Sequence, residues 1–208
     1  MPMPYAAQRR DARATRARIL EAARRELTRD PDSRLADIAA AAGVARRTVY
    51  VHFAGRAALV DGLAAEAAEA IRLAVTGILT PAPDATNDLA RFVLTMWAVG
   101  DRYRTLIRLA RQDLGPDRVN ELLAPAREWV TRVLTRGQRQ GVFQTTVPPA
   151  PLSRAIEAQL LTLLDCVNHG IWSDDGTSAA TAALIAAGVT PDTAAAKVRH
   201  LRGTGSPP

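Results

Sequence analysis

The sequence has one cysteine, one lysine and few aromatic residues, and it has no long apolar run. Cys166 has no second cysteine to pair with, so no internal disulfide can form, and a reducing compartment such as the cytoplasm is expected. No segment reaches the roughly 20 apolar residues of a membrane-spanning helix, and the arginine-rich N-terminus has no apolar core of the kind that a signal peptide needs. We therefore expect neither membrane insertion nor secretion. With 48% hydrophobic residues, a chain of 208 can bury a core.

Positive charge is concentrated at one end of the chain. Residues 1–56 contain twelve arginines and six acidic residues, whereas the remainder is balanced, with fifteen basic and fifteen acidic residues. The whole net charge of +6 therefore lies in the first quarter. This distribution indicates a polyanionic partner for that quarter and a different task for the rest, although a solvated basic surface would give the same charge.

The residue pattern predicts an all-α fold of about nine helices. Good helix formers dominate, and β-branched residues rarely alternate over the length of a strand. Proline-containing breaks are expected at 30–33, with Asp32 or Ser33 as the next N-cap, and at 80–84, 114–117 and 147–151. The predicted helices cover residues 10–28, 35–41, 45–52, 56–79, 86–98, 102–112, 117–140, 150–171 and 177–187.

Residues 40–53, AAAGVARRTVYVHF, have the composition of two short helices joined by a tight turn. Helices this close must cross, and Ala39 provides a small residue at the crossing. Gly43 tolerates the positive φ that the turn requires. The segment therefore predicts a helix-turn-helix, with a plain helical hairpin as the alternative.

The second of these short helices has two different sides. Its packing side consists of Ala45, Val49 and His52, and its outer side of Arg46, Arg47 and Tyr50. The major groove of DNA accepts an α-helix, and an arginine on it can donate two hydrogen bonds to guanine. A recognition helix is thus indicated, while solvated arginines on a hairpin remain the alternative.

The stretch from Arg18 to Val60 resembles the N-terminal DNA-binding domain of the TetR family of bacterial transcriptional regulators. The matching motifs are Ile19-Leu20-x-Ala22-Ala23, Asp37-Ile38-Ala39, Ala42-Gly43-Val44, Thr48-Val49-Tyr50-x-His52-Phe53 and Arg56-x-x-Leu59. The resemblance implies three parts: a helix-turn-helix domain with a basic N-terminal arm (1–56), a helical effector-binding and dimerisation domain (57–202), and a disordered tail (203–208). One departure is Ala45, where the family has Ser or Thr to cap the recognition helix.

The resemblance also implies roles for individual residues. Base contacts are expected from Arg46, Arg47 and Val51. Phosphate contacts are expected from Ser33, Arg34, Thr48, Tyr50, His52 and Arg56, although His52 is as readily a packed residue. The small core is assigned to Ile19, Leu20, Ala23, Leu27, Ile38, Val49 and Phe53. Arginines 9, 10, 13 and 16 are either further DNA contacts or part of a disordered arm.

The apolar spacing near the C-terminus suggests more apolar surface than one thin domain covers. The family pairs its last two long helices with those of a second subunit, and the interface candidates here are Ile156, Leu160, Leu163, Leu164, Val167, Ile171 and Leu184. A homodimer would place two recognition helices on an approximately palindromic double-stranded operator. Burial within a single chain is the alternative for either helix.

Aromatic residues in the middle of the chain suggest a site for a small apolar or amphipathic effector. The candidates are Phe92, Met96, Trp97, Tyr103, Leu106, Trp129 and Val133, each of which is also suited to core packing. The family resemblance implies a repressor whose operator binding is weakened by such an effector. No cofactor is predicted.

Two other functional classes compete with this interpretation. An enzyme could use Cys166 as nucleophile and His169 as base, but a structural cysteine suits this apolar helix better. The three histidines and one cysteine are too widely spread to predict a metal site. A ligand-independent or architectural DNA-binding protein would share the basic charge, but it would not need a large neutral domain.

Overall fold

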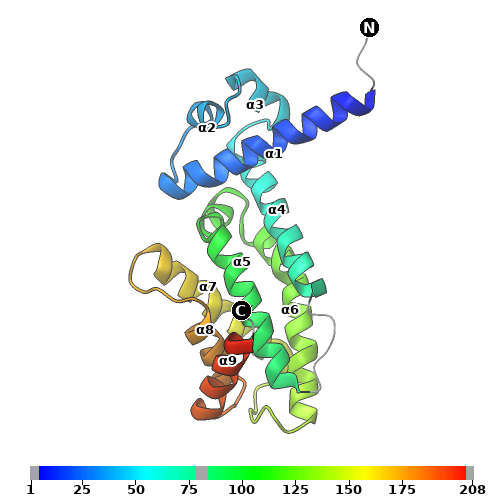
Figure 1. Cartoon of the computed structure of the whole chain (residues 1–208), viewed down its shortest axis with the longest axis vertical. Helices are drawn as coiled ribbons and strands as arrows, with labels where there is room; N and C mark the ends of the chain where they lie inside the picture. The colour runs from blue at the N-terminus through cyan, green and yellow to red at the C-terminus, as the bar shows by residue number, and fades with distance from the viewer. Residues whose placement is uncertain (1–4, 78–83, 205–208) are drawn as a thin grey trace. The chain divides into compact units, whose positions relative to one another are not determined.

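The computed structural model describes residues 5–77 and 84–204. Within these ranges the chain forms α-helices and no strands, as the sequence predicts (Figure 1). The helices are α1 (Tyr5–Arg29), α2 (Leu35–Ala41), α3 (Arg46–His52), α4 (Arg56–Gly77), α5 (Ala85–Asp113), α6 (Pro116–Arg139), α7 (Pro149–Asn168), α8 (Thr177–Ala186) and α9 (Pro191–Thr204). None of these helices is long and apolar enough to cross a bilayer.

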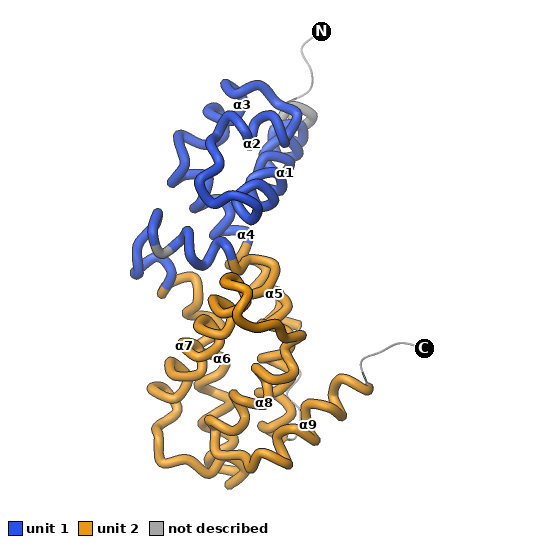
Figure 2. Tube along the Cα trace, turned by 90° about the vertical axis from the view of Figure 1, so that its left-hand side faces the viewer, with its two compact units in different colours: residues 1–66, 105–119 blue, residues 67–104, 120–208 orange. Residues whose placement is uncertain are grey.

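Two compact units make up the chain (Figure 2). Unit 1 consists of residues 1–66 and 105–119, and unit 2 of residues 67–104 and 120–208. The first unit therefore contains the short segment where α5 ends and α6 begins, in addition to the predicted DNA-binding region. The domain boundary predicted after residue 56 falls at the start of α4, whereas unit 1 also includes α4 up to Glu66.

The core of unit 1 consists of the residues that the sequence assigns to it. Ile19, Leu20, Ala23, Leu27, Ile38, Val49 and Phe53 are all buried. They come from α1, α2, α3 and the residue that caps α3, Phe53. Leu59 and Leu63 of α4 are buried as well and complete the core. Burial of these side chains, at about 25 cal/mol per Å² of apolar surface, is what holds such short helices together.

Unit 2 is built on the pairing of α5 with α6. Phe92 of α5 stacks on Trp129 of α6 with ring centroids 4.8 Å apart. One turn earlier on α5, Asp88 is 1% exposed and accepts a hydrogen bond from Arg136 Nη2 at 2.5 Å. Gly137 lies where a Cβ would be 2.1 Å from Phe143 Cδ2, so the absence of a side chain lets the ring pack on α6.

Two helices, α1 and α5, differ from the sequence prediction. The helices predicted at 86–98 and 102–112 are one continuous α5, and Gly100 within it does not break it. A Cβ at Gly100 would be 2.6 Å from Leu164 Cδ1, so the glycine serves close packing against α7. α1 begins at Tyr5 instead of residue 10. The end of the helix predicted at 56–79 and most of the break at 80–84 lie outside the described residues.

The sequence prediction missed α9 entirely. Pro191 opens this helix, where its lack of an N–H costs nothing, and Ala194 and Val198, four residues apart, are buried. The helix ends at Thr204, so the first two residues of the predicted tail are helical, and residues 205–208 lie outside the described part.

Candidate nucleic-acid interface

The turn between α2 and α3 has the geometry that its glycine predicts. Gly43 has φ of 64°, in the left-handed region that glycine adopts without a steric penalty. The N–H of Gly43 donates to the carbonyl of Ala40 at 3.1 Å, and that of Val44 to Ala39 at 3.0 Å. Ala39 is buried at the crossing. The two helices are thereby joined without a flexible linker.

The two sides of α3 differ sharply in exposure. Val49 is 0% exposed and packs into unit 1, whereas Val51 is 81% exposed. Arg46, Arg47 and Tyr50 are exposed as well. The outer side of α3 therefore presents two cationic side chains, a phenol and an apolar side chain to solvent.

The two arginines of α3 have different surroundings. Arg46 Nη2 donates to the Tyr50 hydroxyl at 3.4 Å, and its guanidinium lies 5.7 Å from the centre of the Tyr50 ring. The hydrogen bond with Tyr50 raises the pKa of Arg46 above its ordinary value. No hydrogen bond or ion pair is found for Arg47 within the described part of the chain. Arg46 is thus partly oriented by its own helix, while Arg47 extends from it.

The N-termini of the two short helices are capped differently from the prediction. Arg34 is the N-cap of α2, in place of Asp32 or Ser33, and its N–H donates to Asp37 Oδ2 at 3.0 Å. The carboxylate three residues into the helix thus replaces a capping side chain. Ala45 is the N-cap of α3 and provides no side-chain hydrogen bond, as its sequence implies.

Two predicted phosphate contacts have their polar atoms engaged inside unit 1. Ser33 is 6% exposed, and its hydroxyl donates to the carbonyl of Glu26 at 3.4 Å. Arg56 donates from Nη2 to the carbonyl of Pro31 at 2.7 Å and from Nη1 to that of Ser33 at 3.3 Å. Arg56 therefore holds the α1–α2 loop in place, and its contact with DNA stays a prediction.

The other predicted phosphate contacts lie nearer the surface. Arg34 is exposed, and Thr48 and His52 are half-buried. The His52 ring lies 6.5 Å from the Phe53 ring at an angle of 51°, so it borders the core without being enclosed by it. His52 is therefore neither fully packed nor fully exposed, and both roles, packed residue and phosphate contact, stay open for it.

Asp113 is a neighbour of this surface that sequence reasoning did not identify. Its Oδ2 lies 3.4 Å from Arg56 Nε, although 57 residues separate the two in the chain. A second ion pair, Arg118 with Asp61 at 3.0 Å, also joins the start of α6 to α4 within unit 1. No local pattern predicts such pairs, because only the folded chain brings the residues together.

The predicted effector residues are mostly buried. Phe92, Trp97, Tyr103, Trp129 and Val133 are buried in unit 2, and Met96 is half-buried there, whereas Leu106 belongs to unit 1. Two polar atoms of the same two helices, Asn87 Oδ1 on α5 and Arg136 Nε on α6, are buried without a hydrogen-bond partner among the described residues. Aromatic surface and unsatisfied polar groups thus occur together on α5 and α6.

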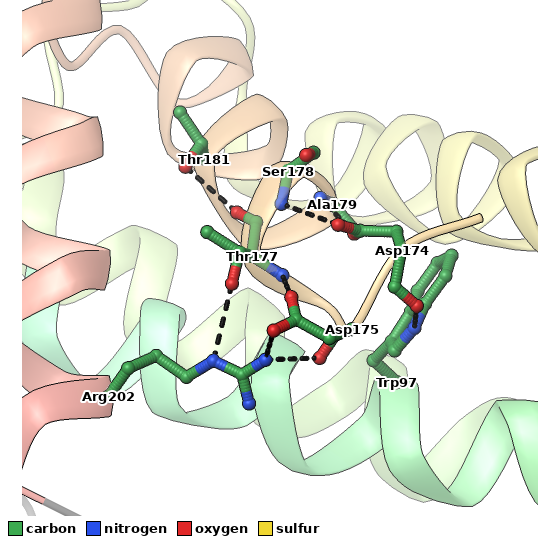
Figure 3. A network of polar contacts seen from close by, with 8 residues as sticks. All are labelled: Trp97, Asp174, Asp175, Thr177, Ser178, Ala179, Thr181 and Arg202. Atoms are coloured by element: carbon green, nitrogen blue, oxygen red, sulfur yellow. Dashed lines mark hydrogen bonds and ion pairs between the residues drawn. The ribbon is translucent and has the colours of Figure 1, made fainter. Parts of the chain in front are cut away.

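Trp97 is part of a polar network that joins α5 to the start of α8 (Figure 3). Its Nε1 donates to the carbonyl of Asp174 at 3.1 Å. The Asp174 carboxylate accepts from the N–H groups of Ser178 at 3.1 Å and Ala179 at 3.0 Å, which are free at a helix start. Arg202 of α9 donates to Thr177 Oγ1 at 3.2 Å and pairs with Asp175. This network therefore fixes the orientation of the Trp97 ring within unit 2.

The predicted interface residues fall into three classes of exposure. Within the single chain, Ile156, Leu164 and Leu184 are buried core residues. Leu160, Leu163 and Val167 are half-buried on α7, and Ile171 is 75% exposed just after it. Ile185 of α8, which the sequence prediction did not include, is also exposed. Apolar surface therefore remains along the C-terminal half of α7, just after it, and at the end of α8.

In the alternative catalytic pair, Cys166 and His169, the imidazole of His169 contacts Asp165. His169 Nδ1 lies 2.8 Å from the carbonyl of Asp165 and 3.6 Å from its carboxylate. Cys166 is half-buried on α7. Among the described residues, no group of three or more His, Cys, Asp or Glu side chains is arranged to hold a metal ion.

Comparison with known proteins identifies both the domain and the fold. Residues 19–63 match the family model described as bacterial regulatory proteins, tetR family. No curated protein matches the chain. The fold of the chain resembles that of a putative TetR-family transcriptional regulator from Rhodococcus sp., with a TM-score of 0.70, 18% identity, and 86% of this chain and 99% of that one covered.

Two further similar structures are complexes with small molecules. One is the regulator FadR from Bacillus subtilis in complex with stearoyl-CoA, with a TM-score of 0.66, 18% identity, and 82% of this chain and 96% of that one covered. The other is LfrR from Mycobacterium smegmatis in complex with proflavine, with a TM-score of 0.65, 23% identity, and 86% and 96% covered. Residues 19–63, which contain the helix-turn-helix, are thus similar to the tetR family of bacterial regulatory proteins, and the chain shares the fold of solved TetR-family regulators.

Proposed function

We propose that this regulator is a repressor that binds an approximately palindromic operator as a homodimer and is released by a small apolar or amphipathic effector. The observation that carries the proposal is the outer side of α3, where Arg46, Arg47 and Val51 are exposed on a helix whose opposite side is fully packed. Such a helix presents charged and apolar groups together to the edges of bases.

Sequence recognition is assigned to three side chains of α3. Arg46 and Arg47 would donate to the O6 and N7 atoms of guanines, and Val51 would contact a thymine methyl group. Tyr50, Thr48 and Arg34 flank them at the surface and would bind phosphates, which fixes the position of the helix without reading the sequence. Ser33, His52 and Arg56 would contribute less directly, since their polar atoms or rings are partly engaged in unit 1.

Dimerisation is assigned to the C-terminal half of α7 and the end of α8. Leu160, Leu163 and Val167 are half-buried, and Ile171 and Ile185 are exposed, so a second copy would cover apolar surface that water now meets. A twofold dimer would place its recognition helices about 34–36 Å apart, on successive turns of the major groove. The twofold symmetry is why the operator is expected to be palindromic, and the spacing sets the distance between its half-sites.

The effector is assigned to unit 2, around the Phe92–Trp129 stack. Buried aromatic rings favour an apolar or amphipathic ligand, and the buried Arg136 Nε and Asn87 Oδ1 could orient a polar group on it. Complexes of proteins of similar fold with stearoyl-CoA and with proflavine support this class of ligand. An effector that favours a mis-spaced dimer would need a coupling of about 1–3 kcal/mol for a several-fold to hundred-fold response.

Selection of binding sites from a random duplex library tests the proposal. The purified full-length chain is expected to enrich a palindrome whose half-sites lie about one helical turn apart, at near-physiological salt. Retention that depends on salt but enriches no site would instead support an architectural DNA-binding protein. The selected operator would then be used to screen ligands for release, and ligand-insensitive binding across such a screen would contradict the effector assignment.

A further inference from the structure

The N-terminal half of α1 is a basic helix and not a loose arm. Residues 9–18 contain five arginines and one acidic residue, Asp11. They belong to a helix that begins at Tyr5 and continues without interruption to Arg29. Five positive charges in ten residues are therefore held at fixed helical positions, with a rise of about 1.5 Å per residue.

One stripe of this helix changes from basic to apolar along its length. Positions 9, 13, 16, 20, 23 and 27 follow each other at alternating steps of four and three, so they lie on one side of the helix. The first three are arginines, and the last three are Leu20, Ala23 and Leu27, which are buried in unit 1. The arginines thus continue, beyond the core, the same side of α1 that packs against α2, α3 and α4.

Arg16 marks the point where the stripe leaves the core. Its guanidinium lies 4.9 Å from the centre of the Phe53 ring, and Phe53 is the residue that ends α3. A Cβ at Gly62 of α4 would be 3.2 Å from Arg16 Nη2, so the same side chain also lies close to α4. The basic stripe therefore starts at the C-terminal end of the recognition helix.

The rest of the stripe extends away from that point. Arg13 and Arg9 lie about 4.5 Å and about 10 Å further along the helix axis, and Arg10 adjoins them, about 60° around the helix from Arg13. Arg9, Arg10 and Arg13 are exposed. In both views the N-terminal half of α1 lies at the same end of unit 1 as α3 (Figure 1, Figure 2).

We propose that the basic stripe of α1, made of Arg9, Arg10, Arg13 and Arg16, binds the phosphate backbone of the DNA that flanks the bases read by α3. Duplex DNA carries one negative charge per about 1.7 Å of its axis, so a rigid helix segment of about 10 Å beside it faces several phosphates. Because the segment is helical, its contacts would position the domain on the duplex and add affinity on every sequence. This inference rests on the proposed function for the orientation of α3 toward DNA.

A pair of double variants tests the stripe. Arg10→Gln/Arg13→Gln removes two of its charges, and Arg18→Gln/Arg25→Gln removes two exposed charges from the opposite side of the same helix. Both retain the helix propensity of the wild type closely, and equal thermal midpoints would show that both fold. Binding would be measured from 50 to 200 mM salt on the selected operator and on an unrelated duplex of equal length.

The expected result is a difference in salt dependence. Arg10→Gln/Arg13→Gln should weaken binding to both duplexes by the same factor, and the slope of log K against log salt should fall in magnitude by about 1.8 for each bound protomer. The ratio of wild-type to variant affinity would then fall about tenfold per protomer between 50 and 200 mM salt. The ratio of specific to non-specific affinity should not change, and the control variant should keep the wild-type slope.

The opposite results are equally clear. If both double variants have the same slope and affinity, the stripe does not contact DNA, and the proposal is overturned even if the wild type selects an operator. If the wild type selects no operator but binds any duplex through the stripe arginines, the specific function fails and the stripe assignment stands. Absence of any DNA binding by the wild type would overturn both.

Discussion

Arg56 Nε lies 3.4 Å from Oδ2 of Asp113, while the two other nitrogens of the same guanidinium donate to the carbonyls of Pro31 and Ser33. One side chain at the start of α4 thus connects the α1–α2 loop to the end of α5 within unit 1. Asp113 Oδ2 accepts no aligned hydrogen bond, so the pair is mainly a charge interaction. It places a carboxylate beside an arginine that is a predicted phosphate contact.

Asp113→Asn is expected to tighten binding to any DNA duplex at low salt. Removing the carboxylate leaves the Arg56 charge available to phosphates, and a partly exposed pair of this kind is worth about 0.2–1 kcal/mol. The salt slope should become steeper, since one more positive charge per protomer takes part. Asp61→Asn, which removes the same charge from the Arg118 pair, is the matched control. Equal effects of the two variants would mean that only net charge matters.

Arg47→Ala and Arg46→Ala are each expected to lose about 1–3 kcal/mol of binding on the selected operator and to relax the preference at one base pair. Arg46 shares its guanidinium with Tyr50, so Tyr50→Phe should reproduce part of the Arg46 loss and leave the Arg47 position unchanged. Affinities measured on single-base operator variants would show this. A uniform loss on all sequences would assign the arginine concerned to a phosphate.

Gly43→Ala is expected to destabilise the helix-turn-helix by about 1–2 kcal/mol, because φ of 64° forces the added Cβ toward its own backbone. Nothing else lies within 4 Å of that Cβ, so the cost is conformational and not steric contact. Gly43→Asn should cost less, since asparagine tolerates this conformation. Urea unfolding would be compared with Gly55→Ala, where φ is not in the left-handed region and no atom lies within 4 Å. Similar losses for the two alanine variants would contradict this account.

Gly137→Ala is expected to destabilise the protein by about 1–3 kcal/mol through overpacking. Its Cβ would be 2.1 Å from Phe143 Cδ2, so the ring must move out of its site on α6. At a helical position without close neighbours, replacing glycine by alanine leaves stability unchanged or raises it. Gly203→Ala, where no atom lies within 4 Å of the added Cβ, provides that comparison.

Adding Phe143→Leu to Gly137→Ala should recover part of the loss, since the two residues share one space. A double-mutant cycle of unfolding free energies would measure the coupling. Additive effects would mean that the cost of the alanine arises elsewhere.

Lys197→Met is expected to lower stability at neutral pH but not in acid. Partial burial disfavours the charged form of Asp84, but hydrogen bonds from Lys197 Nζ, at 2.9 Å, and from Thr86 outweigh it, so the pKa of Asp84 lies below its usual value. A lowered carboxyl pKa adds stability above the unfolded pKa of about 3.9 and loses it as pH falls through the folded value.

The free-energy difference between wild type and Lys197→Met should therefore be full at pH 6–7 and shrink below about pH 4. The hydrogen bond from Thr86 remains in the variant, so part of the shift persists. Urea unfolding at several pH values would measure it. A difference that stays constant from pH 3 to 7 would show that Lys197 contributes only by packing.

The helix-turn-helix could be predicted from the sequence because its information is local. The small residue at the crossing, the glycine at the turn and the three-to-four spacing of apolar side chains all lie within 20 residues, and the buried residues of unit 1 follow that spacing. The outward arginines of α3 follow from the same periodicity. α9 was missed although its signals, an opening proline and two apolar residues four positions apart, are also local.

Other features needed contacts between distant parts of the chain. Gly100 resembles a helix break until Leu164 is seen to pack against it, and Asp113 has no role until Arg56 lies beside it. By itself, the sequence determined the helical class, the recognition helix and the basic character of the first quarter, since propensity, periodicity and charge are properties of neighbouring residues. Only the tertiary structure decided that α5 is continuous, which predicted contacts are already engaged, and that the arginines of α1 continue the packed side of the domain. These three features depend on which surfaces come together when the apolar side chains are buried.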